Sequence, residues 1–163
     1  MDLFSTDDGV ESVDASVRGE RLTLTGAKPG SFFGRSSSEF SAEIVMPALA
    51  ELDAAGSSHL TLSGFEGERL LIDVAGATRI VGNDSRYDEL DLSLAGAGDI
   101  ELDGFVFIDA HVNLAGASSL RLTMVSGALT GAVAGASAIR YFGTVSRQAV
   151  DVAGFSIVEP AEL

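Results

Sequence analysis

The chain has 163 residues and contains neither cysteine nor tryptophan. This length suits one domain with a sizeable core, and the missing cysteines exclude disulfides, thiolate metal sites and cysteine nucleophiles. Ten basic against 24 acidic residues give a formal net charge of −14, which argues against nucleic acid and anionic membranes as partners, and no apolar run is long enough to span a bilayer.

Residues 1–40 lie outside any repeat. Residues 13–26 alternate apolar and polar side chains around Gly19, which predicts a β-hairpin. Residues 27–38 are rich in Gly, Ser and Pro and predict a loop. Residues 44–46 predict a strand, because Pro47 interrupts any helix there. We therefore expect an N-terminal hairpin, cap and loop at residues 1–40 and a repeat region at residues 41–163, within a single domain overall.

An Ala-Gly pair recurs six times after this region, at spacings of 20, 20, 20, 19 and 19 residues. Mostly aliphatic residues stand two and four positions before each glycine and four and six after it, with mostly polar residues between them. This period of two predicts strands that turn one face inward. No single repeat can bury its own apolar face, so the pattern predicts an all-β, parallel β-helix-like solenoid with coils of about 20 residues.

The Ala-Gly pair predicts a tight corner in every coil. The residue before the glycine is always alanine, and the residue after it is small in five of the six copies. A bend that approaches the coils above and below requires small side chains and a positive φ at the glycine. A phosphate loop is disfavoured, because no helix follows. The six corner glycines are Gly56, Gly76, Gly96, Gly116, Gly135 and Gly154.

The end of the chain predicts a protected edge. Pro160 cannot donate a hydrogen bond to a further strand, and Glu159 and Glu162 add negative charge beside it. We therefore expect the last strand to resist pairing with another chain.

Three features of the sequence resemble a known family. They are a strand followed by Met-Pro-x-Leu-x-x-Leu at residues 42–62, the repeated Ala-Gly-Ala units, and Ile-Arg-Tyr-Phe-Gly at residues 139–143. In order and period they resemble, over roughly residues 13–160, the family described as putative auto-transporter adhesin, head GIN domain. The resemblance implies a right-handed β-helix-like fold and a periplasmic, secreted or cell-surface location in bacteria. It transfers no catalytic motif, and residues 1–10 contain no recognisable signal peptide.

Outward-facing acids are the candidate polar site of the repeat region. Asp91, Asp99 and Glu101 belong to a dense acidic patch, which we interpret mainly as a solvated face. Weak binding of Ca²⁺ or a polar ligand is the alternative, and acid catalysis is the least favoured interpretation. His59 and His111 lie nearly three coils apart, so each is interpreted as an isolated histidine. We expect no cofactor, no tightly bound metal and no enzymatic activity.

Phe65 and Phe105 each follow a corner glycine by nine residues. We interpret these and the other aromatic residues mainly as covers for the ends and one corner of the helix. The alternative is a strip that stacks on sugars or on a partner protein.

These observations lead to three functional hypotheses. The leading one is a non-enzymatic, adhesin-like binding module at a bacterial surface or in the periplasm, whose flat sheets recognise glycan or protein. The second is a structural scaffold that self-associates through the ends of its coils. We separately expect a homo-oligomer in which residues 13–24, or the connector that contains Phe32 and Phe33, contact a second chain. The third is a small polysaccharide-processing enzyme.

Overall fold

The computed structural model describes residues 3–4, 14–18, 21–25, 43–44 and 46–162, which belong to two compact units, Met1–Met46 and Pro47–Leu163. In the first unit, two pairs of strands are antiparallel: β1 (Leu3–Phe4) with β4 (Glu43–Ile44), and β2 (Asp14–Arg18) with β3 (Arg21–Thr25). The second pair confirms the strands of the predicted hairpin. Of the strand predicted at residues 44–46, the structure has only Ile44 in a strand, and Val45 is not described.

Several predictions for the first unit lie outside the described residues. They concern the turn at Gly19, the loop at residues 27–38, and the connector with Phe32 and Phe33. The homo-oligomer expected through this region therefore stays a prediction.

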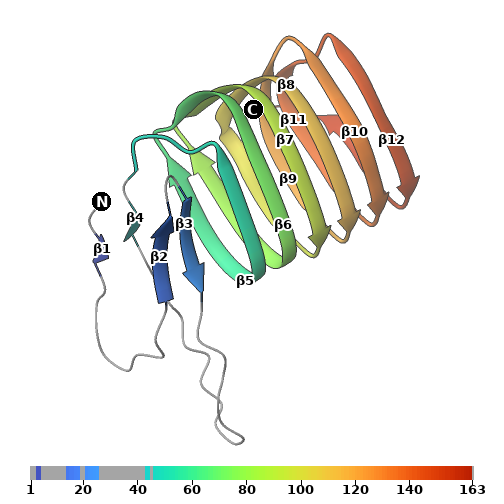
Figure 1. The fold of residues 1–163 in the computed structure, drawn as a ribbon. Coiled ribbons are helices and arrows are strands. Elements are labelled where there is room, and N and C mark those ends of the chain that lie inside the picture. Colours follow the sequence, from blue (N-terminus) through green and yellow to red (C-terminus); the bar gives the residue numbers. More distant parts are fainter. Residues whose placement is uncertain (1–2, 5–13, 19–20, 26–42, 45, 163) are drawn as a thin grey trace, which may run out of the picture. The chain divides into compact units, whose positions relative to one another are not determined.

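The second unit is a β-solenoid of about six turns, in which each pairing between strands is parallel (Figure 1). Equivalent residues stack in register, so that Gly56 pairs with Gly76 and Gly76 with Gly96. This arrangement confirms the predicted all-β solenoid with coils of about 20 residues. No helix among the described residues is long and apolar enough to cross a membrane. The strands are β5 (Glu51–Ser63), β6 (Glu66–Asn83), β7 (Ser85–Gly96), β8 (Asp99–Gly116), β9 (Ser119–Val125), β10 (Ala128–Gly135), β11 (Ala138–Thr144), β12 (Arg147–Gly154) and β13 (Ile157–Pro160).

The six corner glycines form one column, and we number the turns 1 to 6 by them. All six have a positive φ, between 81° and 139°, as predicted. A Cβ atom on Gly76 would also overlap the carbonyl oxygen of Gly56. The four later corner glycines stand in the same relation to the glycine one turn earlier. The corner excludes side chains because the backbone of each turn rests directly on the turn before it.

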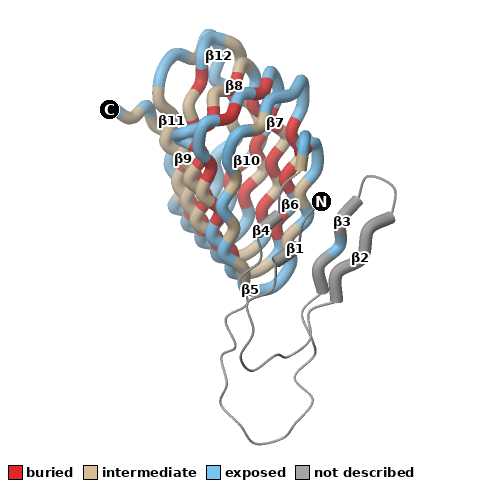
Figure 2. The backbone as a smooth tube through the Cα atoms, turned by 90° about the vertical axis from the view of Figure 1, so that its left-hand side faces the viewer, coloured by how far each residue is buried: buried red, intermediate tan, exposed pale blue. Residues whose placement is uncertain are grey.

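The core follows the predicted alternation. Leu102 is fully buried, whereas its neighbour Glu101 is partly exposed. Figure 2 shows the buried positions recurring from turn to turn along the tube. Burying one such aliphatic side chain contributes about 1.5 to 3 kcal/mol, so the stack supplies the stability of the fold. The columns two and four residues before the glycine and four after it include Ile72, Val74, Ile80, Leu92, Leu94, Ile100, Val112, Leu114, Leu120, Val133 and Ile139, all at most 4% exposed.

Aromatic side chains fill a further side of the core. Tyr87, Phe105 and Phe107 are at most 1% exposed, with ring centroids 5.9 to 6.5 Å apart. The Tyr87 hydroxyl donates a hydrogen bond to the carbonyl oxygen of Leu49 at 2.6 Å, and burial raises the pKa of this hydroxyl. Phe105 therefore belongs to the core, and its alternative interpretation as part of an exposed strip that stacks on sugars or on a partner is wrong. Two consecutive exposed residues, 103 and 104, interrupt the alternation and turn Phe105 inward.

A column of small residues lies two positions after the corner glycines, and nothing in the repeat pattern had drawn attention to it. The column carries a hydroxyl group in five of the six turns and is Gly98 in turn 3. The Oγ atoms of Ser118, Ser137 and Ser156 donate to the carbonyl oxygen of the corner glycine one turn earlier, at 3.3, 3.2 and 3.3 Å. The amide of Ser118 donates to the Oγ of Ser137. In turn 2 the same column contains Thr78, whose buried hydroxyl has no partner within the described part of the chain. The serines thus satisfy backbone groups where the strands bend.

The predicted protection of the final edge covers only part of the last turn. Pro160 ends β13, and the Glu159 carboxylate accepts a hydrogen bond from Arg140 at 3.0 Å. Both residues lie after the corner. The strand before the corner, β12, contains neither.

Candidate ligand-binding groove

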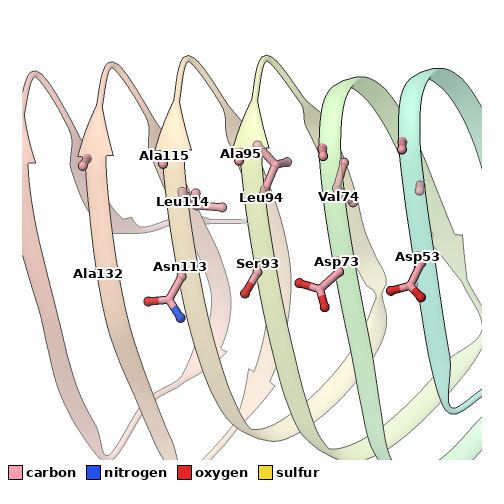
Figure 3. A pocket seen from close by; sticks show the side chains of 14 residues that line it. Asp53, Asp73, Val74, Ser93, Leu94, Ala95, Asn113, Leu114, Ala115 and Ala132 are labelled. Atoms are coloured by element: carbon pink, nitrogen blue, oxygen red, sulfur yellow. The ribbon is translucent and has the colours of Figure 1, made fainter.

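A shallow groove of about 690 Å³ runs along the outside of the solenoid, beside the corner column, from turn 1 to turn 5 (Figure 3). Two outward-facing rows line it, together with the residues that lie between them in the chain, Ala54, Val74, Leu94 and Leu114. The polar row, three positions before each corner glycine, consists of Asp53, Asp73, Ser93, Asn113 and Ala132. The alanine row, one position before each glycine, consists of Ala55, Ala75, Ala95, Ala115 and Ala134.

The repeat itself creates this groove. Positions one and three before the glycine share the outer face, because side chains alternate along a strand. Alanine is required beside the corner and is short, so the alanine row forms a low apolar floor beside longer polar side chains. In Figure 3 the side chains of Asp53, Asp73, Ser93 and Asn113 extend from successive turns in the same direction. Turns repeat at about 4.8 Å, so these four side chains span roughly 14 Å.

The chemical character of the polar row changes along its length. Two carboxylates occupy paired positions in turns 1 and 2, Asp53 and Asp73. Neutral hydrogen-bonding groups follow at Ser93 and Asn113, and the row ends on the methyl group of Ala132. Within the described residues, no group of three or more His, Asp and Glu side chains is placed to hold a metal ion. The groove therefore offers hydrogen bonds and an apolar floor.

A hydrogen-bonded network lies beside the groove at His111. Its Nδ1 is 3.1 Å from the Oγ1 of Thr130, and its Nε2 is 3.1 Å from the Nδ2 of Asn113. Since the Asn113 amide donates to Nε2, the consistent tautomer carries its proton on Nδ1 and donates it to Thr130. His111 is an exposed histidine, as expected, but its hydrogen bonds to Thr130 and Asn113 were not predicted. The network restrains the Asn113 side chain in the groove. Comparing the outward columns of turns 4 and 5 would have revealed this cluster.

The structure separates the predicted acidic residues into two clusters of ion pairs. Asp91 lies on the strand before the corner, and its Oδ2 is 2.8 Å from Nη2 of Arg69. Asp99 and Glu101 lie after the corner, and both contact Arg79, at 3.4 and 3.0 Å. Their arginine partners are about half exposed, so each pair contributes little to stability.

None of the five predicted ligand-contact residues lines the groove. Phe65 is half-buried at the start of the solenoid and Phe105 belongs to the core. The candidates from the sequence did not include the column of Asp53 and Asp73 or the alanine column two residues away. The missing signal was the difference in side-chain length between two neighbouring outward columns.

One family model matches the chain, over residues 3–120, and its description is "Putative auto-transporter adhesin, head GIN domain". The matched segment extends from β1 into β9 and includes the groove lining of turns 1 to 4. Comparison with curated proteins and with solved structures gives no significant match.

Proposed function

Because the chain belongs to the family described as putative auto-transporter adhesin, head GIN domain, we propose that it is an adhesin-like binding module that holds a neutral glycan along the groove. The family description is that of an adhesin head, which implies a cell-surface or secreted location. This premise agrees with the resemblance found in the sequence. The groove supplies a surface on which such a module can act.

The two rows of the groove support a glycan as the ligand. Sugar rings combine hydroxyl groups with apolar C–H faces, and the groove combines the acceptors and donors of Asp73, Ser93 and Asn113 with the methyl groups of the alanine row. A ligand lying along the solenoid axis would meet the same pair of rows at every turn. Several such weak contacts add up when the ligand repeats as the protein does.

The charge of the groove and the backbone pairing of its strands exclude two other classes of ligand. The carboxylates of Asp53 and Asp73, with the net charge of −14, disfavour an acidic polysaccharide. An extended peptide that adds a strand would require a free strand edge. β6, β7 and β8 pair with a neighbouring strand on both sides, so the middle of the groove offers side chains and no free edge. A neutral glycan satisfies both constraints.

The groove also supports binding without turnover. Its only titratable lining residues are Asp53 and Asp73. They extend from neighbouring turns on one side of the groove (Figure 3), whereas glycosidases place two carboxyl groups on either side of the scissile bond. A polysaccharide-processing enzyme is therefore the weaker alternative.

The test is binding of a panel of neutral and acidic oligosaccharides by calorimetry. Ala95→Leu fills the groove and should abolish binding, and Asn113→Ala should weaken it about 2- to 10-fold, since it removes one hydrogen bond. Ala97→Leu is the matched control, because Ala97 is equally exposed on the other side of the corner. Unchanged binding in Ala95→Leu, or a preference for acidic oligosaccharides, would contradict the proposal.

A further inference from the structure

The last turn leaves two strand edges open within the described residues. β13 pairs only with β11 and ends on Pro160, and the longer of the two strands is β12. β12 pairs with β10 over its whole length, and no second strand pairs with it among the described residues. Every second residue of β12 therefore directs its backbone N–H and C=O groups away from the solenoid. Such an edge is a template for a strand from another chain.

Apolar side chains are concentrated at the same end. Of the four large hydrophobic side chains that are exposed in the described residues, Val152 (49%), Phe155 (94%) and Ile157 (44%) belong to turn 6. Val152 occupies the inward position two before the corner glycine. In turns 2 to 5 that position is at most 4% exposed. Val152 is thus exposed because no other turn among the described residues covers it, and a stacked partner would bury it.

We infer that two copies of this chain pair end to end through β12, antiparallel, about a two-fold axis at Ala149. In this register Arg147 faces the partner's Asp151, and the second copy repeats the pair, so four charges are matched. The register also preserves the faces of the sheet, since inward residues meet inward residues, as Gln148 does with the partner's Val150. A two-fold axis closes the assembly at two copies.

Charge distinguishes this arrangement from head-to-tail stacking. If β12 of one copy instead continued onto β5 of the next in the repeat register, Asp151 would stand opposite the partner's Asp53. Like charges directly opposite each other destabilise a strand pair. The antiparallel register replaces that repulsion with two Arg–Asp pairs. It also brings each Phe155 corner against the turn at residues 144–146 of the other copy, which covers the most exposed large hydrophobic side chain described.

Cysteine cross-linking tests the axis, because the chain contains no cysteine. Ala149→Cys places two thiols opposite each other, with Cα atoms about 4.5 to 5.5 Å apart, which a disulfide can bridge. Ala153→Cys is the matched control: it is an exposed alanine of the same strand, and the two copies of it would lie roughly 27 Å apart. Oxidation should give a covalent dimer only with Ala149→Cys. Equal cross-linking of both variants, or none with either, would overturn the proposal.

Charge reversal tests the register by light scattering and sedimentation of the full chain. Arg147→Asp and Asp151→Arg should each weaken dimerisation about 5- to 30-fold, and the double variant should restore it. Asp88→Arg, an exposed position in turn 3, should have little effect. A monomeric wild type, a filament, or tighter association of Asp151→Arg, which head-to-tail stacking requires, would overturn the proposal.

Discussion

The corner column makes a strong prediction when Gly96 is replaced by alanine. Gly96 has a φ of 139°, a conformation that costs a residue with a side chain about 1 to 3 kcal/mol. The new Cβ would also overlap the carbonyl oxygen of Gly76, which accepts a hydrogen bond from the amide of Ala97 at 2.9 Å. Displacing that carbonyl weakens a bond with a net value of about 0.5 to 1.5 kcal/mol. We expect Gly96→Ala to lower the free energy of unfolding by about 2 to 4 kcal/mol.

Gly56→Ala separates the two contributions. Gly56 also has a positive φ, 95°, but a Cβ atom there would meet nothing within 4 Å, because it belongs to the first described turn of the solenoid. This variant should therefore show the backbone strain alone. Urea unfolding at equal protein concentration measures both, and unchanged m-values would show that the same structure unfolds. If Gly96→Ala cost no more than Gly56→Ala, the contact between turns would not explain the glycine column.

Three further predictions address the interior. Leu102→Asp should lower the free energy of unfolding by about 4 kcal/mol or more, because it buries an unpaired carboxylate. Its neighbour provides the control, since Glu101→Gln should leave the melting temperature nearly unchanged. A severe effect of Glu101→Gln would mean that the strand register is wrong. Ser137→Ala should lower the free energy of unfolding by about 1 to 2 kcal/mol in chemical denaturation. It removes the hydroxyl that donates to the carbonyl oxygen of Gly116 and accepts from the amide of Ser118. Ser119→Ala, on the outer face, should change the free energy of unfolding by no more than about 0.5 kcal/mol. Burial raises the pKa of Tyr87, so the folded state favours the protonated phenol. The resulting contribution to the free energy of unfolding is complete below the ordinary tyrosine pKa of about 10 and decreases as the pH rises above it. A denaturation series from pH 8 to 11 should show a smaller alkaline loss of stability for Tyr87→Phe than for the wild type, and equal losses would exclude ionisation of this residue as a cause.

The sequence alone was sufficient to predict the structural features that recur in every turn. The alternation around each Ala-Gly pair predicted that Leu102 points into the core and Glu101 points outward. The small residues at the corner predicted the positive φ of the glycines. Both follow from the geometry of one strand and one bend. Neither requires knowledge of a distant residue, except that an equivalent turn lies above and below.

The tertiary structure decided what depends on differences between neighbouring turns. Phe105 points inward because residues 103 and 104 interrupt the alternation. His111 is hydrogen-bonded to Asn113 in its own turn and to Thr130 in the next turn. The groove exists because alanines stand beside longer side chains in adjacent columns, and Val152 is exposed because no other described turn covers it. Periodicity determines on which side of the sheet a side chain lies. The shape and charge of the surface that this side chain helps to form depend on residues 19 or 20 positions away in the sequence. Such residues become neighbours only when the chain has folded into the solenoid.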